Sequence, residues 1–439
     1  MKSRVITAWL AVALGAAALS GHDTAHAWGS KKKPDPAQEE AQKQQLNPDV
    51  ATALRAAQEL LQKEQWDAAY EKVREAQAVE NKSPFDEFQI AQLLGYTELK
   101  RQRYAEASAA FEQSIASGML PPKDAADLTK LIAQIAMQLK DYPKAVQYSG
   151  KAIESATTPD AELYALRGQA QYLAEDFKGA TETMAQAVEV ARKAGKPVDE
   201  TWLQIELSGY VKLKDEPGVL RSLQQLAIAF PEEKYLQDLF NEWNRQQKDD
   251  DRSLLNLYRL MLQQGLLPDG ESYLRLAQLA VDAGMPGEAV TVLGQAAANK
   301  TFADEMKTER ARRQLSTAKA AAATDRKALQ ALEQATAEKS GEDEVQLGLA
   351  LISFGEHARG AEALQRGIAK GGVKRLDQAQ ILLGQSLVKL NKPAEARAAF
   401  ESLDAASSLK TIAQLWAAYT TPPAAQPATQ PAPEAPAPG

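Results

Sequence analysis

Cysteine is absent from this 439-residue chain, and histidine is nearly so, with three residues. Without thiols the chain forms no disulfide and no thiolate-ligated metal site, and it cannot be a bacterial lipoprotein, which needs a Cys at its cleavage site. Two of the histidines, His22 and His26, fall in an N-terminal segment that we expect to be removed, which leaves His357. A histidine-based catalytic triad or a typical zinc site is therefore not expected.

Aromatic residues are also scarce, at 6% of the chain, and the residues that favour strands are too sparse for a large sheet. Alanine is abundant, while glycine and proline cluster at the ends of segments. This composition predicts an all-helical protein. The length favours several domains or an array of repeats over one globular core.

The N-terminus has the pattern of a secretory signal peptide. Lys2 and Arg4 precede an apolar run from Val5 to Leu19, and Ala25-His26-Ala27 forms an A-x-A cleavage site. The alternative is an uncleaved membrane anchor, which the shortness of the run disfavours. We expect cleavage after Ala27 and a periplasmic location in a Gram-negative bacterium, with no integral membrane segment in the mature chain.

The charge balance is acidic. The formal charge of −7 becomes −8 in the mature chain, because residues 1–27 carry Lys2, Arg4 and Asp23. Positive and negative residues are interspersed, so the sequence has no basic surface for nucleic acid, and we expect no nucleic-acid partner.

Two segments differ from the rest in composition. Residues 28–46 are polar and charged and are expected to be a flexible leader, with weak attraction of Lys31–Lys33 to anionic lipids as the alternative. The tail at 422–439 holds seven of the 21 prolines. It is expected to be extended and disordered, with a docking peptide as the alternative.

A spaced pattern of small residues recurs between these segments. It is clearest in "LLGQSLVKLNKPAEARAAF" (382–400), where Gly384 comes twelve residues before Ala396, and Phe400 four residues after it. The position of Ala396 recurs at Ala69, Ala107, Ala145, Ala180, Ala289, Ala328 and Gly360. The position of Gly384 recurs at Ala57, Gly95, Ala133, Gly168, Ala277 and Gly348.

A glycine inside a helix costs about 1 kcal/mol relative to alanine. Such a cost at a fixed period indicates that a neighbouring helix approaches closely at each of these positions, while the larger residue fills the space between helices. The units are therefore predicted to be helix–turn–helix pairs, each leaving a face uncovered until the next pair stacks on it.

This pattern resembles the tetratricopeptide repeat family, whose signature combines W-x2-L-G-x2-Y with A-x3-F in about 34 residues. The stretches "LLGYTELKRQRYAEASAAFEQS" (93–114) and 382–400 match it closely. The resemblance covers most of 48–404 and weakens over 199–230 and 231–267, where helix pairs with irregular stacking are expected. It implies an all-α solenoid of roughly nine or ten stacked helix–turn–helix units, some of them degenerate.

The expected organisation follows from these boundaries. It comprises a signal peptide (1–27), a flexible charged leader (28–46), an N-terminal repeat array (47–230), a degenerate repeat or hinge (231–267), a C-terminal array (268–407), a capping helix (408–421) and a disordered Pro/Ala-rich tail (422–439).

Catalytic and metal-binding signals are poor. His357 lies three residues before Gly360, at the aromatic position of its unit, which favours a structural role. The acidic run "KDDDRS" (248–253) lacks the spaced ligands and the glycine of a calcium loop. We therefore predict no enzyme activity, no cofactor and no metal.

Recognition is the expected chemistry. In the family that this chain resembles, the first helix of each unit lines a concave groove, and the residue after the small residue tends to face it. That position holds the candidate partner-binding residues Gln58, Tyr96, Gln134, Gln169, Gln278 and Gln385. An amide both donates and accepts, so such a row suits an extended peptide. The alternative is that these amides bond one another or water. The clamp by which some family members hold a C-terminal carboxylate is not expected, since Lys130 alone fits it.

A second resemblance concerns context. Residues 76–121 and 367–404 look like exported tetratricopeptide proteins that accompany TonB-type energy-transducing systems. It implies a periplasmic scaffold that binds a protein or peptide and associates with an inner-membrane transport complex. The alternatives are a regulator or assembly cofactor of a cell-wall or exopolysaccharide enzyme, and a glycan-processing enzyme, for which no carboxylate pair stands out.

Overall fold

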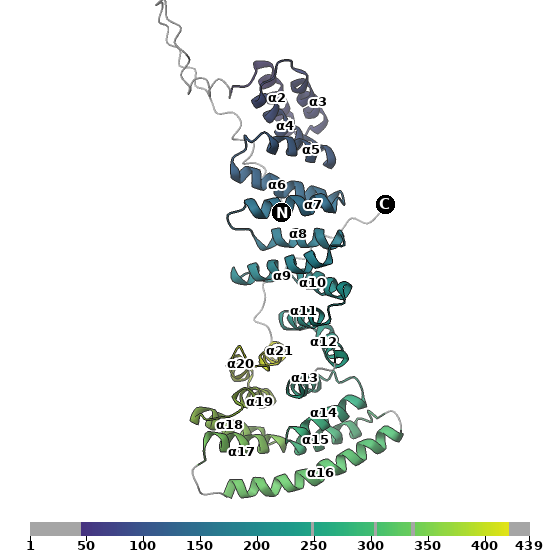
Figure 1. Ribbon diagram of the computed structural model, residues 1–439, viewed down its shortest axis with the longest axis vertical. Coiled ribbons are helices and arrows are strands. Elements are labelled where there is room, and N and C mark those ends of the chain that lie inside the picture. The colour runs from purple at the N-terminus through teal and green to yellow at the C-terminus, as the bar shows by residue number, and fades with distance from the viewer. Residues whose placement is uncertain (1–44, 247–249, 303–304, 335–338, 421–439) are drawn as a thin grey trace, which may run out of the picture. The chain divides into compact units, whose positions relative to one another are not determined.

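The computed structural model describes residues 45–246, 250–302, 305–334 and 339–420, which form helices and connecting turns without a strand (Figure 1). The predicted signal peptide, the tail and nearly all of the leader lie outside these residues. The chain divides into two compact units, one ending at Pro197 and one beginning at Val198. Among the described helices, none is both long and apolar enough to cross a membrane.

The first unit consists of helix pairs in sequence order. They are α2 (Pro48–Gln62) with α3 (Trp66–Ala78), α4 (Pro84–Lys100) with α5 (Tyr104–Ala116), α6 (Pro122–Gln138) with α7 (Tyr142–Ser155), and α8 (Ala161–Leu173) with α9 (Phe177–Lys193). The second helices α3, α5 and α7 also pack against the first helix of the pair that follows them. This stacking confirms the predicted all-α repeat solenoid.

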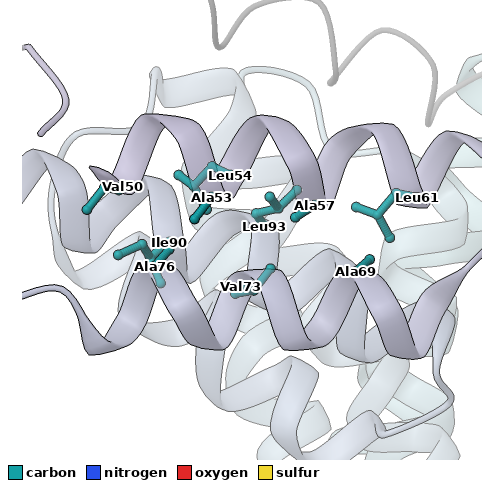
Figure 2. Close-up of a cluster of buried hydrophobic side chains, with 10 residues drawn as sticks. All are labelled: Val50, Ala53, Leu54, Ala57, Leu61, Ala69, Val73, Ala76, Ile90 and Leu93. Carbon is teal, nitrogen blue, oxygen red and sulfur yellow. The ribbon is translucent and has the colours of Figure 1, made fainter. Parts of the chain in front are cut away.

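The first pair illustrates how a unit buries its apolar face. Five residues of α2, from Val50 to Leu61, point toward Ala69, Val73 and Ala76 of α3 (Figure 2). Ile90 and Leu93 of the next pair complete this cluster. A single pair therefore cannot cover its own apolar surface, and stability depends on stacking.

Short polar side chains define where the helices begin. Ser83 and Asp86 form a reciprocal capping box at the start of α4. The Asp86 carboxylate also accepts a hydrogen bond of 2.8 Å from the backbone N–H of Asn47, which caps α2. Thus one nearly buried carboxylate ties together the starts of two successive first helices.

The recurring glycines are points of close approach, as the spacing predicts. A Cβ added at Gly95 would overlap the ring of Phe111, and one added at Gly384 would overlap the ring of Phe400. At Gly168 the added Cβ would stand 3.0 Å from the Met184 side chain. In each case the large residue comes sixteen positions later and projects from the second helix of the pair into the space that the glycine leaves.

A left-handed residue makes the turn between the two helices of a pair. In the first unit the turn residues are Glu64, Gln102, Lys140 and Glu175, with φ between 57° and 63°. Gly284, Gly355 and Asn391 have the same conformation in the second unit. Each stands five residues before the small residue in the first turn of the second helix, so the turn belongs to the same repeat as the helix contacts.

The second unit begins with one regular helix pair and then departs from the pattern. Its helices are α10 (Glu200–Leu213), α11 (Glu216–Ala229), α12 (Glu233–Gln246), α13 (Asp251–Gln264), α14 (Gly270–Asp282), α15 (Pro286–Ala298), α16 (Glu305–Gln334), α17 (Gly341–Ser353), α18 (His357–Lys370), α19 (Leu376–Lys389), α20 (Pro393–Glu401) and α21 (Lys410–Thr420). In α12 and α13 the rings of Phe240 and Tyr258 meet edge to face, with centroids 4.7 Å apart.

The prediction of a helix–turn–helix repeat around Ala328 is wrong. Residues 305–334 form one continuous helix of 30 residues, in which Ala328 is exposed. A narrow stripe of Ala311, Ala318, Ala322 and Leu329 is buried instead. The segment has no glycine or proline at which the helix could end, and no left-handed residue forms a turn there.

The last helix closes the second unit onto its own beginning. Besides its neighbour α20, α21 packs against α11, α13 and α19 (Figure 1). Trp416 is 2% exposed, and its indole N–H donates a hydrogen bond of 3.0 Å to the backbone oxygen of Asn256, 160 residues earlier. The Tyr419 hydroxyl bonds the backbone oxygen of Glu232 at 2.8 Å. The helix therefore joins distant parts of the unit as well as covering the last pair.

Candidate functional site

The structure places four of the predicted groove residues on successive first helices of the first unit. Gln58 on α2 and Tyr96 on α4 are half-buried, while Gln134 on α6 and Gln169 on α8 are exposed. Helices α6 and α8 contact each other, so the two exposed amides lie on adjacent helices. Neither side chain has a hydrogen-bond partner among the described residues. We call these four residues the amide row.

The remaining two predicted residues lie in the second unit, and both are bonded. The Gln278 amide on α14 donates to Asp282 of its own helix at 2.9 Å. Gln385 on α19 is 7% exposed, and its amide donates to Oδ1 of Asn256 on α13 at 2.7 Å. The amide of Gln385 thus connects two distant helices of the second unit. Lys130, at the clamp position, is paired with Asp160 at 3.1 Å.

A cavity of about 240 Å³ lies inside the second unit, where α13, α15, α17, α18, α19 and α21 converge. Ile352, Leu382 and Trp416 provide apolar and aromatic wall. The polar groups of the wall come from several helices and include Arg259, Glu288, Gln295, His357, Gln385, Ser386 and Lys389. We call this cavity the closure pocket, since α21 supplies part of its wall.

Two of the charges in the closure pocket neutralise each other. The Arg259 guanidinium binds the Glu288 carboxylate through Nε at 2.8 Å and through Nη2 at 2.5 Å. Its Nη1 donates to Oδ1 of Asn256 at 3.2 Å, and Nη2 also lies 2.9 Å from the Met285 sulfur. A bidentate pair with these further contacts holds its geometry firmly.

His357 and Lys389 supply the polar groups that this pair does not occupy. The His357 ring is half-buried, with Nδ1 3.5 Å from the Ser386 hydroxyl. Burial lowers the pKa of His357, the positive charge of Lys389 lowers it further, and the Glu288 carboxylate opposes both. The Lys389 side chain is exposed and forms no ion pair with the described residues.

Sequence reasoning assigned His357 a structural role and did not select Arg259, Asn256, Glu288, Lys389 or Trp416. One signal was available, because a histidine replaces the aromatic or proline residue that opens the second helix in other units. The other residues meet through closure of the unit, which the repeat pattern does not specify. Within the described residues, no group of three or more His, Asp or Glu side chains is placed to hold a metal ion.

Comparison with protein families identifies a repeat family in two segments of the chain. A model described as "Tetratricopeptide repeat" matches residues 93–158 and 345–410. These segments contain most of α4 through α7 and most of α17 through α20. No curated protein matches the chain.

Solved structures that match the chain share little sequence with it. MamA from Desulfovibrio magneticus is 16% identical, covers 42% of this chain and 95% of its own, and has a TM-score of 0.31. A tetratricopeptide repeat protein from Parabacteroides merdae is 12% identical, covers 78% of this chain and 100% of its own, and has a TM-score of 0.32. YrrB, described as having an unusual peptide-binding site, is 16% identical, covers 45% of this chain and 93% of its own, and has a TM-score of 0.33.

Proposed function

Since two segments of the chain match the tetratricopeptide repeat model, we propose that the protein is an exported scaffold that binds a protein or peptide along the amide row. The observation that carries the proposal is the state of Gln134 and Gln169. Their amides occupy the same repeat position on adjacent first helices, exposed and without partners among the described residues. Amides so placed can each donate to and accept from the backbone of an extended peptide.

The surroundings of the amide row support one extended partner. Tyr96, on the first helix of the preceding pair, adds a half-buried aromatic ring to the row, and the Lys100 ammonium lies 5.5 Å from its centroid. A row of hydrogen-bonding groups with an aromatic side chain gives main-chain contacts as well as a place for one side chain of the partner. We therefore propose binding without catalysis as the role of the first unit.

The cellular setting is part of the same proposal. We infer that the chain is cleaved after Ala27 and acts in the periplasm, as an accessory of a TonB-type envelope transport complex. The signal-peptide pattern and the resemblance of 76–121 and 367–404 to exported proteins support this inference. N-terminal sequencing of the protein from fractionated cells would begin at Trp28 if it is right, and an intact Met1 would refute it.

The binding proposal is tested by crosslinking in the periplasm with a photoreactive residue at Tyr96, followed by identification of the captured protein. Replacing Gln134 and Gln169 by alanine should weaken binding of that protein at least tenfold, since each amide would lose a pair of hydrogen bonds worth about 1 kcal/mol each. Binding would be measured by titration with the purified partner.

The matched control replaces Gln113 and Gln186, which are exposed glutamines on the second helices α5 and α9. This variant should bind like the wild type. If both double variants bind equally well, the amide row is not the binding surface. Capture of a cell-wall synthase or polysaccharide enzyme in place of a transport protein would instead indicate that the scaffold serves that enzyme.

A further inference from the structure

The closure pocket is separate from the amide row and differs from it in shape. An open solenoid presents its inner helices to an extended chain, but in the second unit α21 packs against α11, α13 and α19. What remains beside it is a cavity of about 240 Å³. Pockets for small molecules are typically about 300–1,000 Å³, so this one has room for a compact molecule and not for a peptide strand.

The charges of the closure pocket select the sign of its occupant. Arg259 and Glu288 cancel each other through two hydrogen bonds, and Arg259 is further occupied by Asn256. Lys389 is left with an uncompensated positive charge at the wall. Since Lys389 is the charged lining residue without a partner of opposite charge, the pocket favours an anion over a cation.

The apolar part of the wall determines what kind of ligand body fits next to the anionic group. Ile352, Leu382 and Trp416 offer apolar and aromatic surface close to the polar groups. The His357 ring lies in the same wall and provides a second nitrogen that can donate to an oxygen of the ligand. We infer that the closure pocket binds a small organic carboxylate with an apolar body, whose carboxylate is held by Lys389 and His357.

Binding should depend on pH through His357. The charged groups that share the wall with it are Lys389 on α19, Glu288 on α15 and Arg259 on α13, while Glu356 and Arg359 flank it on its own turn. Without a ligand, burial and the positive charge of Lys389 lower the pKa of His357. The negative charge of a bound carboxylate raises that pKa. Binding therefore takes up protons, and affinity should rise as the pH falls from 7.5 to 5.5.

Phenylacetate is a suitable probe, and phenylacetamide is its neutral control. Titration of the full-length protein, followed by ligand-observed NMR, should give a dissociation constant for phenylacetate on the order of 1 mM, as expected for a fragment of ten heavy atoms. The amide should bind at least about fivefold more weakly, since it lacks the charge. No detectable binding of phenylacetate at 10 mM, which is roughly ten times this constant, would overturn the inference.

Two variants separate the roles of the residues. Lys389→Gln should weaken binding of phenylacetate about fivefold at both pH values, because its charge acts in both. The His357→Gln variant should bind phenylacetate equally well at pH 5.5 and pH 7.5. The wild type should bind it roughly threefold more tightly at pH 5.5 than at pH 7.5. Lys392→Gln is the matched control, since Lys392 is exposed, pairs with Glu395 and does not line the pocket.

Other outcomes reject the assignment. Equal binding of phenylacetate and phenylacetamide, or an unchanged dissociation constant in Lys389→Gln, would show that the anion is not held there. If a short acidic peptide displaces phenylacetate at a lower concentration than phenylacetate itself binds, the occupant is a side chain of a partner and not a free carboxylate. Because Lys389 is exposed, its replacement should leave the protein folded, so a loss of binding reports on the missing charge.

Discussion

At the scale of single residues, the close approach at Gly384 is the feature most open to test. A Cβ at this position would overlap the ring of Phe400, which is 1% exposed. Gly384→Ala should lower the free energy of unfolding by about 1–2 kcal/mol, since overpacking outweighs the gain in helix propensity. Denaturant unfolding of the full chain would measure the change.

Gly294 offers the opposite case in the same unit. It is helical and exposed, and an added Cβ would meet nothing within 4 Å. Gly294→Ala should therefore stabilise the protein by about 0.5–1 kcal/mol.

The contact between Gly384 and Phe400 can be tested in a Phe400→Leu background. There Gly384→Ala should lower the free energy of unfolding by less, because the ring that the new Cβ overlaps is absent. Similar effects of alanine at both glycines would contradict the interlocking contact.

At the scale of helices, α21 holds the second unit closed. Trp416→Phe removes the indole N–H that donates to the buried backbone oxygen of Asn256. The loss should cost about 1–3 kcal/mol, and hydrogen exchange should quicken in α13 and α19 as well as in α21. Gln414→Ala, at an exposed position of the same helix, is the control and should change neither. Faster exchange confined to α21 would mean that the helix only caps the last pair.

Helix α16 shows where repeat periodicity misleads. Ala328 and Leu332 have the same spacing as the small and large residues near the start of the second helix in other pairs. The genuine pairs also have a left-handed turn residue five positions earlier, such as Gly284 or Gly355. At the corresponding place α16 has Ala323, within a run free of glycine and proline, and the helix simply continues. The turns of the first unit fall on Glu64, Gln102, Lys140 and Glu175, so the type of residue at this position does not by itself mark a turn. The spacing of contact residues is therefore insufficient to predict a helix pair.

At the scale of the whole molecule, the stacking of repeats was predictable and the closure of the second unit was not. Contacts within a pair span sixteen residues and repeat, so Gly95 and Phe111 already indicate how neighbouring helices meet. The bond between Gln385 and Asn256 spans 129 residues and occurs once. Its formation depends on the curvature that accumulates over several pairs, which no single repeat determines. For the same reason the sequence indicated the amide row and missed the closure pocket.

The two units should also differ in how they unfold. Helix pairs of the first unit contact their neighbours in sequence, whereas α21 ties the second unit to helices far back in the chain. The second unit should open as one cooperative block, and the first pair by pair. We expect Gly95→Ala to speed hydrogen exchange under denaturant mainly in its own pair, α4 and α5, and Gly384→Ala to speed it throughout the described helices of 198–420, each by about tenfold for a loss of 1.4 kcal/mol. Mass spectrometry of peptides from the full chain would follow both ranges, and if each variant affected both equally, the chain would be a single cooperative unit.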